Sequence, residues 1–449
     1  MSEFRAGAAK AVITPPLGYP MGAWVLRQGL STGVHDHLYA KALVLDDGAG
    51  KIAVVALDVC GITRETLDAI RAKIRRLTGI PADHLLVNST HNHTTPDIFR
   101  SVPPLLELYT EYMADQVAGA VYEASHALEP AVAGYAWGDL PGMTVNRQYK
   151  ERPVDTAVGV LRIDRSDGTP LARLINWACH NLTVGGQYLT WSADFTGVAC
   201  DFVEAADPGC VCMFISGAGG DVHPFDWWMG NTESKHMHTF DDTEAFGTAL
   251  GAEVVATLER AAVQRDVTLG AASRIIQMPR QRVSWTVEAA ERLHRELVQK
   301  HGTYLRETWA EGTNTAVSAM QNPAVYGTGM AQLTLARDQD KPPIAAELQA
   351  FRIGDLRIAC NPGELFNELG SRIKDDAGRG TTWVASYCND YIGYISTRMA
   401  HEEIADVPLE DIAGQDRYRR FYGTTTSPFS HQAGESLVAA AVDLVSGLD

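Results

Sequence analysis

The sequence predicts an α/β protein of the mixed α+β kind, with one large domain (1–449) of mixed β-sheets flanked by helices. Two observations support this class. Short apolar runs alternate with segments of helical periodicity through most of the chain. No internal repeat, low-complexity tract or Pro- or Ser-rich linker marks a domain boundary.

The first elements are expected before residue 130. Residues 39–59 predict a hairpin, because two runs rich in Val, Ala and Leu flank an Asp-Asp-Gly-Ala-Gly turn. Residues 63–80 predict a helix that starts at a threonine and stops at a glycine. We expect a strand over 84–90 and a helix over 108–128.

The remaining elements continue the alternation. Residues 157–180 predict a second hairpin, and residues 210–221 predict a buried strand that ends in a glycine-rich turn. Residues 286–321 have a helical and more charged pattern, so we expect a peripheral helical insertion there. Strands are expected again over 348–364 and 381–390. Several of these strands end in residues that can bind metal or transfer protons, and sites in sheet enzymes gather at strand ends.

The composition excludes several function classes. It is typical of a soluble globular protein, with 45% hydrophobic and 21% charged residues. A formal net charge of −17 argues against a nucleic-acid surface and against attraction to an anionic membrane. Without an apolar signal-peptide core or a membrane-length apolar run, we expect a cytoplasmic protein with no membrane span. The seven scattered cysteines indicate reduced thiols.

The stretch STHNHTTPD places His91 and His93 at the end of an apolar strand. In an extended segment, residues i and i+2 face the same side, so both imidazoles could converge on one metal ion. A hydrogen-bonded strand end explains the pair equally well. The motif alone is weak evidence for a metal site.

Two further motifs carry polar side chains after apolar strands. In NWACHNLTV…SADFTG, His180 ends a strand, and Asp194 either caps the following helix or presents an outward carboxylate. In GAGGDVHP, four small residues allow close backbone approach to a ligand, or simply form a tight turn before Asp221 and His223. No Gly-Lys-Ser/Thr follows, so a phosphate-binding loop is excluded.

The C-terminal third adds a carboxylate. Glu364 follows Pro-Gly at a strand-to-helix junction, where the helix dipole also favours a first-turn carboxylate. In NDYIGYISTR, Tyr391, Tyr394 and Arg398 are most simply interpreted as packing and surface residues. Two histidines at strand ends, taken with Glu364, would make the two-His, one-carboxylate set of a catalytic zinc with an open position.

Nine motifs in order resemble the neutral/alkaline non-lysosomal ceramidases and their shorter bacterial relatives. They span nearly the whole chain, apart from the helical region at 286–321: AGAAKAVITPPLGYPMGAW with VHDHLYAKALVLDDG, LDVCGI, STHNHTTPD, VNRQY, CHNLTV…SADFTG, GAGGDVHP, PGELFNELGSRIK and GYISTR…FYGTTTSPFSHQAGE. The family's catalytic domain is a zinc amidohydrolase, which cleaves the amide of ceramide in its founding members. The resemblance therefore implies that fold and that chemistry.

The resemblance also assigns residues to the metal. It implies one Zn²⁺ per chain, with His91, His180 and Glu364 as ligands and Tyr394 as the fourth ligand. It places His93 beside the metal site rather than on the ion.

Further residues are implied to act on the substrate. Arg147 matches an arginine near the scissile group, and Tyr422 matches, more weakly, a tyrosine that would steady the oxyanion. His223 stands where the ceramidases carry a serine once proposed as nucleophile, which excludes a serine acyl-enzyme at that position and leaves attack by a metal-bound water. The general base is then expected among His93, Asp194 and His223.

The expected function is zinc-dependent hydrolysis of an amide bond in a small molecule. We expect neither the C-terminal immunoglobulin-like domain of the large ceramidases nor a signal peptide, and this expectation disfavours ceramide itself as substrate. Trp-rich stretches at 190–191 and 225–228 would suit an apolar or aromatic substrate. The alternatives are a zinc esterase or lactonase and a non-catalytic, metal-stabilised binding protein. The sequence is compatible with a homo-oligomer.

Overall fold

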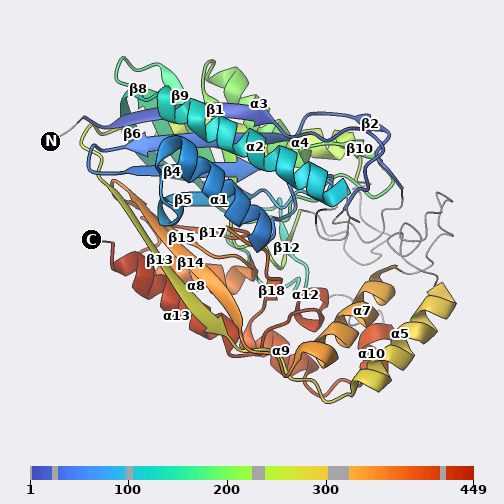
Figure 1. The fold of residues 1–449 in the computed structure, drawn as a ribbon. Helices are drawn as coiled ribbons and strands as arrows, with labels where there is room; N and C mark the ends of the chain where they lie inside the picture. Colours follow the sequence, from blue (N-terminus) through green and yellow to red (C-terminus); the bar gives the residue numbers. More distant parts are fainter. Residues whose placement is uncertain are drawn as a thin grey trace.

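Eight strands form the larger sheet of the computed structural model (Figure 1): β1 (Arg5–Val12), β3 (Tyr39–Asp46), β4 (Lys51–Leu57), β5 (Leu85–Ser89), β6 (Glu129–Asp139), β8 (Ala157–Arg165), β9 (Pro170–Trp177) and β11 (Val211–Ser216). Their order is β11-β9-β8-β6-β1-β3-β4-β5, so β11 and β5 are the two edges. Two neighbouring pairs are parallel, β4 with β5 and β9 with β11. The carboxyl ends of β5 and β9 lead directly into the segments that carry His91 and His180.

The structure describes residues 3–22, 29–96, 98, 105–224, 238–301, 323–414 and 421–448. Within these ranges, no helix combines the length and the hydropathy that a bilayer crossing requires.

A smaller sheet packs face to face against the larger one. Its strands, in spatial order, are β13 (Leu269–Met278), β14 (Ile344–Ile353), β15 (Leu356–Cys360) and β17 (Thr382–Ala385). Side chains of both sheets share one buried cluster, in which Phe351, Ile358 and Trp383 pack with Leu43 and Val54. Because helices cover its other face, the larger sheet is buried on both sides, which explains why β3 and β4 are buried along nearly their whole length and are apolar apart from Lys41 and their end residues.

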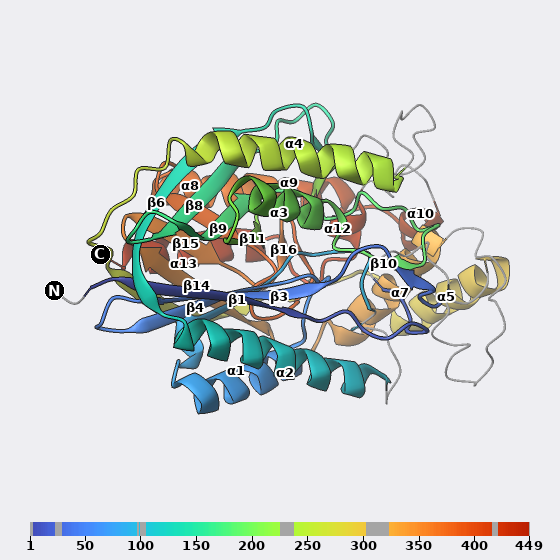
Figure 2. The same ribbon diagram turned by 90° about the horizontal axis from the view of Figure 1, so that it is seen from above.

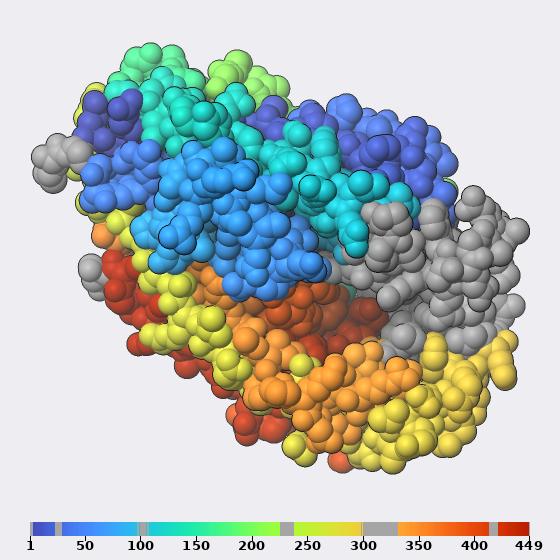
Figure 3. Space-filling view, in the orientation of Figure 1, coloured from blue at the N-terminus to red at the C-terminus, as the bar shows by residue number. Residues whose placement is uncertain are grey.

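Helices cover the two outer faces and complete four layers. Figure 2 shows α1 and α2 over one half of the larger sheet and α3 and α4 over the other. From the side drawn in Figure 3, the blue and cyan helices α1 and α2 hide much of that sheet. The outer face of the smaller sheet is covered by α8 and α13. The bounds are α1 (Arg64–Thr78), α2 (Leu105–His126), α3 (Asp194–Ala206), α4 (Phe240–Leu258), α8 (Asn367–Ala377) and α13 (Ala433–Ser446).

The remaining elements are short strands and a group of helices at one end of the molecule (Figure 1). In that group, Ala290, Leu333 and Leu409 pack together from three different helices. The bounds are β2 (Gly33–Val34), η1 (Ala82–His84), β7 (Val145–Asn146), β10 (Thr190–Trp191), β12 (Val222–His223), α5 (Val287–His301), α7 (Pro323–Asp338), β16 (Glu364–Leu365), β18 (Tyr394–Ile395), α9 (Arg398–Ile404), α10 (Leu409–Gly414) and α12 (Tyr422–Thr425).

The structure confirms the predicted fold class, both hairpins and the strand at 84–90. The predicted helix at 63–80 is α1, which begins after its cap residue Thr63 and ends at Gly79 in the left-handed conformation (φ 77°). The expected helical insertion begins as predicted with α5, whereas residues 302–322 lie outside the described residues. The assignment of the chain to one domain stays a prediction.

The first strand, β1, was not predicted, because it is rich in alanine rather than in β-branched residues. A packing constraint explains its composition. A Cβ on Gly7 would collide with the backbone oxygen of Ala124 in α2. Small residues in β1 therefore allow α2 to approach the sheet closely.

Buried hydrogen bonds join the two edges of the larger sheet to the end of β17. Asn88, in edge strand β5, accepts a hydrogen bond from the backbone N–H of Ser216 in edge strand β11 (3.0 Å). It also donates to the carbonyl of Ser386 (2.6 Å), whose own N–H donates to the carbonyl of Ser216 (2.9 Å). These three residues, which we call the strand-end junction, are all fully buried. The larger sheet therefore curls until its edges meet, and several strand ends gather at one place.

The junction is expected to stabilise the whole fold. The hydroxyl of Ser216 donates to the carbonyl of Ser89 (3.0 Å). Ser216→Ala leaves that buried carbonyl without this donor and should lower the free energy of unfolding by about 1–3 kcal/mol. Urea denaturation followed by circular dichroism measures the change. Ser436→Ala, on the exposed face of α13, is the matched control and should change stability by less than about 0.5 kcal/mol. Equal effects of the two variants would contradict a stabilising role for the Ser216 hydroxyl beside the junction.

Candidate metal centre

Three side chains from distant parts of the sequence converge at the gathered strand ends. His91 follows β5, His180 follows β9, and Glu364 opens β16. The Nε2 atoms of the two histidines lie 3.3 Å apart. Oε2 of Glu364 lies 3.1 Å from Nε2 of His91 and 3.3 Å from Nε2 of His180. The three side chains are almost completely buried, and their ligand atoms are arranged so that one metal ion could contact all of them.

The hydrogen bonds of the two histidines determine which nitrogen is available. Nδ1 of His91 lies 2.8 Å from the carbonyl oxygen of Cys60, and Nδ1 of His180 lies 2.6 Å from that of Gly219. A carbonyl only accepts, so each Nδ1 carries the proton and donates it. Each Nε2 then offers a lone pair toward the other and toward Glu364. This second-layer pattern is typical of metal-binding histidines.

These lone pairs need a cation between them. Oε2 of Glu364 has no hydrogen-bond donor of acceptable geometry among the described residues. Tetrahedral zinc with bonds of about 2.0–2.1 Å places its ligand atoms roughly 3.3–3.4 Å apart, close to the separations between these three residues. The donor set therefore fits zinc in both chemistry and spacing.

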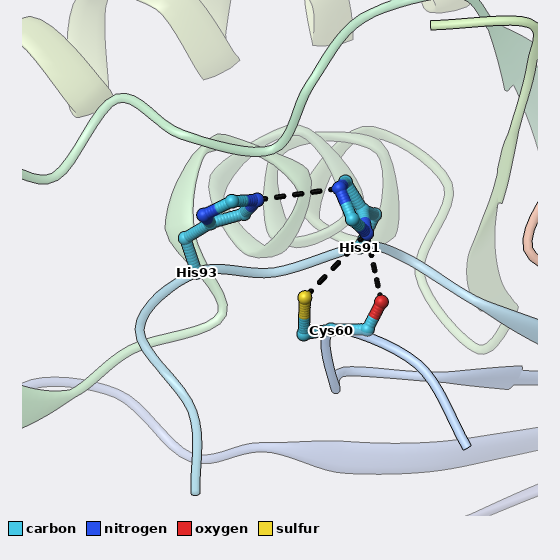
Figure 4. A group of neighbouring side chains, drawn as sticks. All are labelled: Cys60, His91 and His93. Atoms are coloured by element: carbon cyan, nitrogen blue, oxygen red, sulfur yellow. Dashed lines mark hydrogen bonds between the residues drawn. The ribbon is translucent and has the colours of Figure 1, made fainter. Parts of the chain in front are cut away.

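A second group of potential ligands, Cys60, His91 and His93, fits a metal less well. Figure 4 shows that Cys60 and His93 lie on different sides of the His91 ring. The thiol of Cys60 is 3.6 Å from Nδ1 of His91, whereas Nε2 of His93 is 3.3 Å from its Nε2. The group therefore does not surround one point, and His93 adjoins the first cluster as a neighbour.

The electrostatics of the cluster follow from burial and from its opposite charges. Burial would raise the pKa of Glu364, but the His91 and His180 imidazoles hold it well below its ordinary value. Burial would lower the pKa of His91, but Cys60 and Glu364 raise it to about 10. Burial and the Arg147 guanidinium lower the pKa of His180 to about 4. In the metal-free chain, one proton on His91 therefore serves as the cation beside Glu364.

The backbone around the cluster is strained. His91 (φ 56°), Tyr387 (φ 56°) and Asn389 (φ 62°) are in the left-handed region, which non-glycine residues rarely adopt. The ring of Tyr387 stacks on that of His91, with centroids 4.0 Å apart and planes 12° apart. Strain of this kind concentrates at functional sites, where the surrounding structure holds it in place.

The glycine-rich turn after β11 supports two members of the cluster. The carbonyl of Gly219 orients His180, as described above. A Cβ on Gly220 would collide with the backbone oxygen of Glu364, so that residue must be glycine for the two segments to approach. The small residues of this turn serve contacts within the protein, in place of the ligand contact considered from the sequence.

Tyr394, Arg147 and Tyr422 lie together beside Glu364. Tyr394 of β18 pairs with Glu364 of β16 in a parallel two-stranded sheet. The Arg147 guanidinium lies over the Tyr394 ring, 5.2 Å from its centroid. The centroids of the Tyr394 and Tyr422 rings are 5.9 Å apart. The backbone N–H of Arg147 donates to the carbonyl of Asp221 (2.8 Å). The structure thus brings the three predicted residues into one group next to the cluster.

Asp194 has a different place from the one expected for a general base. Its carboxylate accepts hydrogen bonds from the backbone N–H groups of Thr183 (3.0 Å), Val184 (3.0 Å) and Phe195 (2.7 Å), and from the Thr183 hydroxyl. These contacts occupy the lone pairs that a base would use. Asp194 thus anchors the segment after His180 to the start of α3, and its role as a base stays a prediction.

His223 and the tryptophans complete the predicted set. His223 is fully buried in β12, and the neighbouring carbonyl of Val222 accepts a hydrogen bond from the backbone N–H of His180 (3.0 Å). Trp191 is fully buried in the core, so it does not line an open pocket as proposed from the sequence. Residues 225–228 lie outside the described residues.

One residue of the centre was assigned incorrectly from the sequence. The hydroxyl of Tyr391 donates a short hydrogen bond to Oε1 of Glu364. Tyr391 therefore contacts the cluster directly and is no simple packing residue. The available signal was its position in the same motif as Tyr394, but side-chain direction within a loop cannot be read from spacing.

Comparison with known proteins gives matches in structure alone. The sequence matches no family model and no curated protein. The neutral ceramidase from Pseudomonas aeruginosa aligns with a TM-score of 0.72 at 18% identity, covering 100% of this chain and 75% of that one. A ceramidase complexed with C2 aligns with a TM-score of 0.73 at 18% identity and the same coverage. The chain therefore has the fold of neutral ceramidase.

Proposed function

We propose that the protein is a zinc-dependent hydrolase that cleaves an amide bond in a small molecule. The observation that carries this proposal is the convergence of Nε2 of His91, Nε2 of His180 and Oε2 of Glu364, three lone-pair donors at the spacing of zinc ligands. The shared fold supports amide cleavage, since ceramidases act on an amide. It also supports a lipid-like substrate, with an ester or a lactone as the closest alternative.

The cluster would hold the metal, with Tyr394 as the proposed fourth ligand. When bound, zinc would polarise the scissile carbonyl and lower the pKa of water to about 7. The fixed imidazoles keep both Nε2 atoms directed at one point without rearrangement, because their Nδ1 protons are committed to the carbonyls of Cys60 and Gly219.

His93 is the proposed general base. Its Nε2 lies 3.3 Å from Nε2 of His91, so it is within reach of a group bound at the cluster. Arg147, buried against Tyr394, would stabilise negative charge on the carbonyl oxygen together with Tyr422. His223 lies in β12, which pairs with β7, the strand just before Arg147. It would influence the rate of the reaction without binding the metal.

Metal content and substrate preference test the proposal together. The purified protein should bind about one zinc per chain and hydrolyse N-acyl compounds faster than matched esters and lactones. His91→Ala and His180→Ala should each lose zinc and activity, because each removes one of three protein ligands. His126→Ala, at the exposed end of α2, is the control and should retain both. Full zinc occupancy in the two cluster variants would refute the ligand assignment.

Zinc binding should release protons. At pH 6 the metal-free His91 is protonated because its pKa is about 10, whereas His180, with a pKa of about 4, is already neutral. At pH 6 the two histidines together should therefore release about one proton per zinc and not two, which raises the affinity about tenfold per pH unit through this group. Calorimetric titration in two buffers of different ionisation enthalpy measures the proton count. Binding without proton release would contradict the His91–Glu364 ion pair.

The role of His93 can be separated from metal binding. His93→Asn should retain zinc while kcat falls about 100-fold or more, as for loss of a general base. His223→Ala should retain zinc with a smaller loss of kcat. Steady-state kinetics and metal analysis on the same samples make the comparison. Wild-type kcat in His93→Asn would place the base elsewhere, and an unchanged rate in His223→Ala would return that residue to a structural role.

A further inference from the structure

The loop between β17 and β18 contacts two of the proposed ligands through two tyrosines. The hydroxyl of Tyr391 donates to Oε1 of Glu364. The ring of Tyr387, four residues earlier, stacks on His91 at 4.0 Å. The two residues thus act on neighbouring ligands by different means, one through a hydrogen bond and the other through a ring face.

The two carboxylate oxygens of Glu364 have different partners. Oε1 is engaged by the phenol, while Oε2 faces the imidazoles of His91 and His180. A free carboxylate could rotate and present either oxygen, or both, to a metal. With Oε1 held by the phenol, Oε2 is the oxygen that faces the two imidazoles.

We propose that Tyr391 is a positioning residue that makes Glu364 a one-oxygen ligand. The inference rests on the proposed metal function of the cluster. By restricting Glu364 to Oε2, Tyr391 leaves room at the ion for a reacting group, which binding through both oxygens would occupy.

The loop is rigid enough to impose this orientation. Asn389 accepts a hydrogen bond from the backbone N–H of Val87 in β5 (3.0 Å) and donates to the side chain of Gln349 in β14 (2.6 Å). The backbone N–H of Asn389 donates to the carbonyl of Val87 (2.8 Å). The loop is therefore bound to β5, the strand that leads into His91, and this fixes the position of both tyrosines relative to His91.

The hydroxyl of Tyr387 provides a matched comparison. It is completely buried and has no hydrogen-bond partner among the described residues. Tyr387→Phe removes a hydroxyl that makes no hydrogen bond to the described residues and preserves the stacked ring. Tyr391→Phe removes a hydroxyl that holds Glu364 and changes the volume by the same amount. The two variants differ in this one respect.

Zinc affinity, measured by competition with a fluorescent chelator, tests the proposal. Tyr391→Phe should weaken zinc binding about 10–100-fold, the usual effect of losing a hydrogen bond to a metal ligand. Tyr387→Phe should stay within about twofold of wild type. Cooperative thermal unfolding of the metal-free forms shows that both variants are folded, and Tyr391→Phe should unfold at the lower temperature because it loses a buried hydrogen bond.

A double-mutant cycle shows whether Tyr391 acts through Glu364. Glu364→Gln should weaken zinc binding, and adding Tyr391→Phe should cause little further loss, because the group that Tyr391 positions has already been replaced. Independent losses that add in the double variant would overturn the proposal, since a general structural role produces them.

The outcomes separate this inference from the proposed function. If the wild-type chain binds zinc and Tyr391→Phe binds it equally well, Tyr391 does not position Glu364, while the metal function stands. If the wild-type chain binds no zinc, both are refuted. A weakened Tyr391→Phe together with an equally weakened Tyr387→Phe would also overturn the inference, because a disturbed loop would then explain the loss.

Discussion

The strand-end junction of Asn88, Ser216 and Ser386 is the constraint on which the rest of the structure depends. Strands β5 and β11 are opposite edges of the larger sheet, and they meet because their buried polar groups satisfy one another there. An unpaired group at that depth would cost several kcal/mol, so alternative arrangements are disfavoured. His91 lies three residues beyond Asn88 in the chain, so the junction sets the place of that ligand before its side chain is considered.

The candidate metal centre concentrates features that are unfavourable in isolation. Three lone pairs face each other, and the backbone at His91 and Tyr387 is left-handed, at a cost of about 1–3 kcal/mol for each residue. The fold tolerates this strain because several contacts hold the residues in place. The Tyr387 ring stacks on His91, the Cys60 carbonyl accepts the His91 proton, and Asn389 anchors the loop to β5. A cation, either a proton on His91 or a metal ion, relieves the repulsion. The arrangement of these three side chains therefore favours binding of a positive charge between them.

The sequence predicts the fold where local patterns decide it, as in the hairpins and α1, and it groups His91, His180 and Glu364 because each follows an apolar strand. It misplaces residues whose direction depends on distant partners. Tyr391 is such a residue, because its hydrogen bond to Glu364 is set by the folded loop. The backbone donors around Asp194 are likewise revealed only by the folded loop. His91 and His93 do converge as the sequence suggested, with Nε2 atoms 3.3 Å apart, although the backbone at His91 is left-handed and not extended.

The glycine-rich turn after β11 holds two of the three clustered side chains in place independently of residue 223. Gly219 orients His180 through its carbonyl, and Gly220 lets the backbone of Glu364 approach, so the turn supports two ligands through main-chain atoms. His223 comes after those contacts, on β12. A substitution of His223 would therefore leave the contacts of Gly219 with His180 and of Gly220 with Glu364 in place. The proposed metal binding and the proposed proton transfer would then depend on different segments of the chain, the first on the turn after β11 and the second on side chains outside it.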